Sequence, residues 1–191
     1  MPKVGMEPIR RKSLVEAAIS AIHSRGSLDI TIRDIATLAG VSQGLAHHYF
    51  SNKEDLLLSA MRHLLTEYGK QVRIETGKAH APQGRLRAII RASLGTEQFR
   101  PEIISVWLVF YVHAQASEKA HRLLSVYSRR LRSNLVYNLR PLAGGRSPFI
   151  AEGIASMIDG LYIRQALNNL PERISAAELV EDYLERQLSQ A

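Results

Sequence analysis

The stretch TIRDIATLAGVSQGLAHHYFSNK, residues 31–53, decides the fold of this chain of 191 residues. Two short apolar periodicities lie on either side of residues 39–41, whose sequence AGV is compact enough to let two helices cross closely. Thr31 heads a capping-box pattern, and Ser42 is suited to cap a second helix. The arrangement predicts a helix-turn-helix over residues 31–50, a motif whose second helix enters the major groove of DNA.

The second predicted helix presents a short polar face that is suited to hydrogen bonding. Glutamine can bond an adenine edge bidentately, and histidine can bond a phosphate. A glycine at position 44 lets the backbone approach a base or phosphate closely. The full set of predicted DNA contacts is Thr31, Arg33, Ser42, Gln43, Gly44, His47, His48, Tyr49 and Lys53. The alternative is an ordinary solvated helix face, with Thr31 and Ser42 acting as caps and Lys53 as a plain surface lysine.

Helical periodicity continues through the rest of the chain, which predicts an all-α protein of about nine helices without strands. The segment 78–84 is predicted to be a loop, and the long helix at 117–140 is expected to end at Pro141. We predict two domains, a DNA-binding domain over residues 1–52 and a ligand-binding and dimerisation domain over residues 53–191.

Composition excludes several classes of protein. The chain has no cysteine, which excludes a disulfide scaffold, a thiolate metal site and a cysteine nucleophile. Its formal net charge of +7 favours a polyanionic partner, although the basic residues are not concentrated near the N-terminus. The basic residues Lys3, Arg10, Arg11 and Lys12 could form an arm that tracks the DNA backbone, or simply an ordinary basic terminus.

The sequence also bears on location and on catalysis. The longest apolar run, 103–112, is too short for a bilayer, which needs about 17–25 residues, and no signal peptide is recognisable. We therefore expect a cytoplasmic protein with no membrane partner. There is no HExxH pattern, no glycine-rich phosphate loop and no metal-ligand spacing among the histidines, so we expect no enzyme activity, metal or cofactor.

The helix-turn-helix segment resembles the N-terminal signature of the TetR family of repressors. The resemblance rests on the turn at residues 39–42, on the tail His48-Tyr49-Phe50 and on Lys53, and it covers about the first quarter of the chain. One position departs from the family pattern, because His47 stands where a phosphate-contacting tyrosine is usual. A phosphate contact from His47 would depend on pH.

A narrower resemblance extends over most of the chain. The start MPKVGMEPIRRK, the segment VWLVF around Trp107, SRRLRSNLV at 128–136 and MIDGLYIRQAL at 157–167 resemble the BetI-type branch of the family. This resemblance implies a homodimeric repressor of genes for glycine betaine synthesis from choline. It also implies a palindromic operator, from which choline would release the protein.

A choline site would need aromatic faces and a countercharge. Cation–π attraction to a quaternary ammonium is worth about 2 kcal/mol or more when desolvated. The predicted ligand residues are Trp107, Phe110, Tyr111, Tyr127, Asp159 and Tyr162, with Glu152 as a second candidate for the countercharge. The alternative is that the aromatics pack the core and that Asp159 pairs with Arg164 or Arg130.

Dimerisation is predicted to use the last two helices, and the helix from residue 52 to about 73 is predicted to connect ligand and DNA. The residues expected to form the dimer seam are Ile150, Ile154, Ile158 and Leu161. Two other functions stay open. The same DNA-binding protein could respond to another cationic or apolar molecule, as in multidrug efflux control, or the chain could be a helical enzyme or interaction module.

Overall fold

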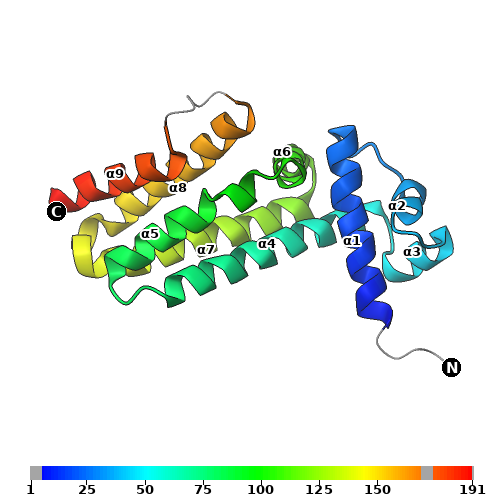
Figure 1. Ribbon diagram of the computed structural model, residues 1–191, viewed down its shortest axis with the longest axis horizontal. Coiled ribbons are helices and arrows are strands. Elements are labelled where there is room, and N and C mark those ends of the chain that lie inside the picture. The colour runs from blue at the N-terminus through cyan, green and yellow to red at the C-terminus, as the bar shows by residue number, and fades with distance from the viewer. Residues whose placement is uncertain (1–5, 169–173, 191) are drawn as a thin grey trace. The chain divides into compact units, whose positions relative to one another are not determined.

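The computed structural model describes residues 6–168 and 174–190, and all regular structure within these ranges is helical (Figure 1). The all-α fold predicted from periodicity is confirmed for this part of the chain. None of its helices combines the length and the apolar character needed to cross a bilayer. Contacts divide the chain into two compact units. Unit 1 is Met1–Leu65 with Pro101–Leu123, and unit 2 is Thr66–Arg100 with Leu124–Ala191.

Unit 1 is organised around α1 (Met6–Arg25). This helix packs on α2 (Ile32–Leu38) and on α6 (Pro101–Ala116), and α2 packs in turn on α3 (Gln43–Tyr49) (Figure 1). The start of α4 (Lys53–Gly77) completes the unit. Helix α3, which is only 7 residues long, is therefore joined to α1 through α2.

The four-residue spacing of apolar residues in α1 explains its place in unit 1. Leu14, Ala18 and Ile22 form one stripe of the helix, and all three are buried. The helix ends at Gly26, which has a φ of +63° and donates its N–H to the carbonyl of Ile22 at 2.8 Å. Glycine adopts this left-handed conformation without strain, so α1 stops where the turn toward α2 must begin.

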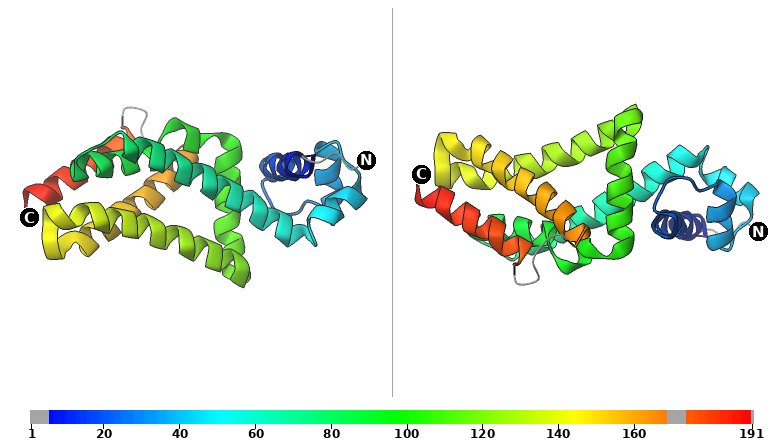
Figure 2. Two further views of the ribbon diagram at one scale, coloured as in Figure 1. Left: turned by 90° about the horizontal axis from the view of Figure 1, so that it is seen from below. Right: turned by 90° about the horizontal axis from the view of Figure 1, so that it is seen from above.

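Unit 2 contains the second part of α4 and most of α7 (Glu118–Ala143). Its other elements are α5 (Pro82–Ser93), η1 (Thr96–Phe99), η2 (Gly144–Arg146), α8 (Ser147–Ala166) and α9 (Ala176–Ser189). Helix α9 packs against both α8 and α5 (Figure 2). A Cβ at Gly153 of α8 would collide with the ring and hydroxyl of Tyr183 on α9, so glycine permits the close contact of these helices.

Two helix boundaries differ from the prediction. Helix α5 begins at Pro82 inside the segment predicted to be a loop, because proline fits the first turn of a helix, where its missing N–H costs nothing. Helix α7 continues through Pro141 to Ala143 before Gly144 turns the chain with a φ of +48°. A proline near the end of a helix thus did not end it.

The division into units does not coincide with the predicted domains 1–52 and 53–191. Unit 1 extends to Leu65 and includes Pro101–Leu123, because α6 packs on α1. Both α4 and α7 have residues in each unit. The contact between α1 and α6 joins segments that are far apart in the chain, and local periodicity gives no indication of such a contact.

The predicted dimer seam requires a correction. Ile150, Ile154 and Ile158 are 0%, 0% and 2% exposed in the single chain, and Leu161 is also buried. These side chains are core residues of unit 2, where α8 packs against α9. Residues that one chain already buries cannot also contact a second copy, so an interface on α8 must use a different face of that helix.

Candidate nucleic-acid interface and ligand site

The N-terminus of α2 is fixed by the capping box that the sequence predicted. The backbone N–H of Thr31 donates to the Asp34 carboxylate at 2.9 Å, and the N–H of Asp34 donates to the Thr31 hydroxyl at 3.1 Å. Hydrogen bonds from Thr31 hold the pKa of Asp34 below its usual value, and the bond from the backbone N–H contributes most. Arg33, in the first turn of α2, is exposed.

Helix α3 is capped by Ser42, whose hydroxyl accepts a hydrogen bond from the N–H of Leu45 at 3.2 Å. Its one fully buried residue is Ala46. The remaining predicted contacts on this helix are exposed, namely Gln43, Gly44, His47 and His48. Because Ala46 is the one residue of this short helix that is fully buried, its polar face is presented to solvent. The major groove of DNA admits one helix, so α3 could enter it with this face.

Two further residues of α3 qualify the prediction. The ring of Tyr49 is half-buried and packs edge-to-face on His48, with ring centres 5.3 Å apart. A Cβ on Gly44 would meet no atom within 4 Å, so the space over this residue is open. Open space beside exposed Gln43 and His47 is suited to the close approach of another molecule.

Lys53 has a structural contact that neither sequence-based interpretation included. Its ammonium donates to the carbonyl of Leu28 at 2.9 Å and thereby joins the start of α4 to the turn after α1. Nearby, the guanidinium carbon of Arg11 lies 4.8 Å from the centre of the Phe50 ring, which makes Arg11 part of the packing around α3. Lys3, the first residue of the predicted basic arm, lies outside the described residues.

A second link within unit 1 joins the start of α4 to the turn between α6 and α7. The hydroxyl of Ser117 donates to the Glu54 carboxylate at 2.6 Å, and the Lys119 ammonium lies 3.6 Å from the same group. His113 Nε2 lies 3.9 Å from Glu54 and is buried. The Ser117 hydrogen bond, followed by the charges of Lys119 and His113, lowers the pKa of Glu54.

Within unit 2, the structure brings two of the predicted ligand residues together around Tyr68. The ring of Tyr68 packs edge-to-face on that of Tyr127, with centres 5.7 Å apart. The Tyr68 hydroxyl shares a hydrogen bond of 2.8 Å with Ser93. Burial and the charge of Asp159 raise the pKa of Tyr68, burial contributing most. Neither Tyr68 nor Ser93 was among the predicted ligand residues, because they contact each other across 25 positions.

The other predicted ligand residues have different surroundings. Tyr162 of unit 2 is buried, stacks on Phe99 with ring centres 5.2 Å apart and donates to the Gln98 carbonyl at 3.1 Å. Burial raises the pKa of Tyr162.

In unit 1, Trp107 and Phe110 are buried, and the Trp107 ring lies 5.6 Å from that of Tyr111. The predicted set is thus divided between the two units.

The two candidate carboxylates are both exposed on α8. Glu152 lies 3.5 Å from Arg132, which makes it part of a surface ion pair between α7 and α8. Asp159, which lies in an otherwise apolar stretch of the sequence, is exposed as well. Its effect on Tyr68 places its charge close to the tyrosine cluster, so it remains the better candidate for a countercharge.

Comparison with protein families matches both parts of the chain. Residues 14–60 match the family described as bacterial regulatory proteins, tetR family. Residues 82–189 match the family described as BetI-type transcriptional repressor, C-terminal. The second match covers more than half of the chain.

Individual proteins give the same result. The HTH-type transcriptional regulator BetI of Brucella abortus (strain 2308) is 52% identical over 191 residues, which are 99% of this chain and 96% of the relative. The regulator of that name from Agrobacterium fabrum (strain C58) is 50% identical and covers 98% of this chain, which spans 92% of it.

Solved structures share the fold at lower identity. A transcriptional regulator from Pseudomonas aeruginosa PAO1 superposes with a TM-score of 0.85 at 23% identity, over 95% of this chain and 91% of the other. A regulator from Saccharomonospora viridis, described as in complex with choline, gives 0.78 at 22% identity, over 96% and 97%. At these identities the likeness shows the fold alone.

Proposed function

The chain belongs to the TetR family of bacterial regulatory proteins and is a transcriptional repressor of the BetI type; from this premise we propose that α3 reads operator DNA and that choline, bound in unit 2, releases it. The genes under control would be those for glycine betaine synthesis from choline. The observation that carries the DNA-reading part is the exposed polar face of α3, where Gln43, His47 and His48 have no core to pack against.

The proposed DNA contacts on α3 and at the start of α4 have different roles. Gln43, in the first turn, contacts a base edge, since an amide can donate to and accept from an adenine at once. His47 and His48 contact phosphate, and Gly44 lets the backbone come close. Lys53 holds the turn at Leu28 and can offer its remaining N–H groups to a phosphate, so it contributes affinity without base preference.

A homodimer would present two α3 helices to a palindromic operator, about 34–36 Å apart if the half-sites are one helical turn apart. For the dimer surface we propose the exposed stripe of α8. Its members recur at helical spacing, and they are Phe149, Ser156, Gly160 and Ile163, followed by Leu167 directly after the helix. Phe149 is 71% exposed in the single chain, and Gly160 leaves open space for a facing helix.

We propose that choline binds at Tyr68 and Tyr127, with Asp159 as the countercharge. Aromatic faces attract a quaternary ammonium, and a nearby carboxylate adds Coulombic attraction to its positive charge. The choline named in the Saccharomonospora viridis structure supports this choice of ligand for a protein of the same fold.

Release of DNA requires that choline bind one state of the protein better than the other. Helix α4 carries both Tyr68 and Glu54, and Glu54 is bonded to Ser117 at the turn before α7. We propose that a shift of α4 on choline binding is transmitted through this contact and through the Lys53–Leu28 bond, and that it changes the orientation of α3.

The test measures binding of the purified protein to operator DNA by fluorescence anisotropy, with choline chloride replacing sodium chloride at constant ionic strength. We expect choline to lower DNA affinity. Asp159→Asn should weaken the choline effect about tenfold and leave DNA affinity without choline unchanged. Asp182→Asn removes an exposed carboxylate of α9 and serves as the matched control.

Two outcomes would contradict the proposal. Full DNA affinity at saturating choline, together with release by a lipophilic cation such as tetraphenylphosphonium, would favour the multidrug alternative. An equal loss of response in Asp159→Asn and Asp182→Asn would show that the Tyr68 cluster is not where the cation binds.

A further inference from the structure

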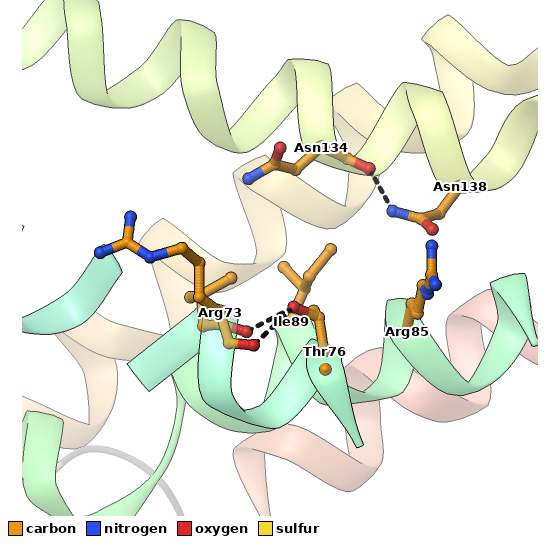
Figure 3. A pocket seen from close by; sticks show the side chains of 8 residues that line it. Arg73, Thr76, Arg85, Ile89, Asn134 and Asn138 are labelled. Carbon is orange, nitrogen blue, oxygen red and sulfur yellow. Dashed lines mark hydrogen bonds between the residues drawn. The ribbon is translucent and has the colours of Figure 1, made fainter. Parts of the chain in front are cut away.

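Unit 2 contains a cavity of about 280 Å³ that is separate from the Tyr68 cluster. It lies between the end of α4, the first two turns of α5 and the C-terminal half of α7 (Figure 3). The polar groups that line it are Arg73 and Thr76 on α4, Arg85 on α5, and Asn134 and Asn138 on α7. The lining contains two guanidinium groups and no carboxylate, so the cavity is electropositive.

These two arginines differ from others in the same unit. Arg87 and Arg91 of α5 form ion pairs with Glu185 and Glu181 of α9. In the part of the chain that the structure describes, no ion pair is formed by Arg73 or by Arg85. The nearest carboxylate along α4, that of Glu75, is 2.8 Å from the Lys78 ammonium and is already neutralised.

Arg85 is held in place by its own chain. Its Nε donates to the carbonyl of Ala79 at 3.1 Å, a bond that fixes the guanidinium and leaves its terminal amino groups for another partner. Guanidinium groups with a fixed orientation bind planar oxyanions bidentately and lose little side-chain entropy in doing so. Figure 3 shows Arg85 and Asn138 pointing toward each other from α5 and α7.

The two asparagines complete the polar wall. Asn138 is 7% exposed, and its side-chain N–H donates to the backbone carbonyl of Asn134 at 2.8 Å. The side chain of Asn134 is exposed and its amide can donate to an oxyanion. The Thr76 hydroxyl donates to the Val72 carbonyl at 2.7 Å, which leaves its oxygen as an acceptor for a ligand hydroxyl.

We propose that this cavity binds a small organic dianion, whose oxyanion groups are bound by Arg85, Arg73 and the Asn134 amide. The volume suits a molecule below drug size. Dicarboxylates and phosphates share the required chemistry, whereas a cation such as choline would be repelled. The site is independent of the DNA and choline proposals, because its ligand and its residues differ from theirs.

Isothermal titration of the full-length protein with sodium succinate and, separately, sodium phosphate tests the proposal at ionic strength held constant with sodium chloride. We expect saturable binding at one site per chain for at least one anion. Arg85→Gln should weaken it about tenfold or more, since a charge-assisted hydrogen bond is lost. The matched control is Arg129→Gln on exposed α7 surface, where the guanidinium donates to the Ser125 carbonyl of its own helix.

A second variant distinguishes a loss of anion binding from a folding defect in Arg85→Gln. Asn134→Asp is isosteric, lies on an exposed position and places a negative charge at the cavity, so it should abolish anion binding while the thermal midpoint stays close to that of the parent. Preference for succinate or for phosphate identifies the source of the oxyanion. Absence of saturable binding by both anions up to about 10 mM, a threshold near the weak limit of specific affinity, overturns the proposal. Equal weakening by Arg129→Gln also overturns it.

Discussion

Helices α3 and α8 carry the two recognition surfaces that the sequence predicted, and these surfaces differ in their exposure to solvent. The polar face of α3 is exposed, as a DNA-reading face must be. The apolar stripe of α8 that was predicted to meet a second copy is instead buried inside its own chain. The difference lies in what each pattern can specify.

A polar face on a short helix specifies solvent or a polar partner, because burying it in the protein's own core would leave hydrogen-bonding groups unsatisfied. An apolar stripe specifies only that something covers it. Ile150 and Ile154 are covered within their own chain, and a periodicity argument cannot distinguish this from cover by a partner.

The largest expected effect concerns the core side of α8. Ile154→Ala should lower the free energy of unfolding by about 2–5 kcal/mol, because it leaves a cavity in a fully buried site. Phe149→Ala on the exposed stripe should change the stability of the single chain by less than about 0.5 kcal/mol. Urea unfolding at several protein concentrations separates these effects from dimerisation. A variant Ile154→Ala that unfolds like the parent but fails to dimerise would restore the original seam.

The second effect contrasts base reading with backbone binding in unit 1. Gln43→Ala should relax base preference at one position of each half-site, at a cost of about 1–3 kcal/mol for the preferred base. Lys53→Ala should weaken binding to all sequences similarly and reduce the salt dependence of the affinity. Anisotropy titrations on a set of single-base operator variants measure both. Uniform loss in both variants would remove the base-reading role of Gln43.

Two glycines of α8, seven positions apart, give a smaller and cleaner contrast. Gly153→Ala should destabilise unit 2, because its Cβ collides with Tyr183. Gly160→Ala meets open space and should stabilise the helix by about 0.5–1 kcal/mol. Thermal unfolding at low protein concentration compares the pair. The contrast would be broken if both substitutions shifted the midpoint in the same direction.

The smallest effect is on the acid sensitivity of unit 1. The pKa of Glu54 is lowered in the folded state, so its contribution to stability is present above the ordinary value of 4.5 and is lost as the pH falls through the lower folded value. The difference in stability between the parent and Glu54→Gln should therefore shrink as the pH falls below about 4.5. Urea midpoints measured between neutral pH and acid pH test this, and a difference that grows toward acid pH would contradict it.

Much of unit 1 could be predicted because its signals are local. The caps at Thr31 and Ser42 and the stop at Gly26 each depend on residues within four positions. The contacts that were missed are long-range. Glu54 meets Ser117 across 63 positions and Lys53 meets Leu28 across 25, and both use ordinary surface residue types that no sequence motif distinguishes.

The proposed ligand site has the same limit. Residue type and helical spacing selected Tyr127 and Asp159 as candidates but not Tyr68, whose ring packs against Tyr127 and whose pKa responds to the charge of Asp159. Tyr162 was selected by the same criterion, yet its hydroxyl is bonded to the Gln98 carbonyl. Residue type and spacing therefore selected candidates without indicating which of them lie together.

The most direct test of the central claim is selection of bound DNA from a random pool by the parent protein and by Gln43→Ala, each with and without choline. The account predicts a palindromic consensus for the parent, loss of base preference at one symmetric pair of positions for Gln43→Ala, and little recovered DNA in the presence of choline. Recovery of the same consensus by both proteins, or of no consensus by the parent, would contradict the assignment of the exposed α3 face to base reading.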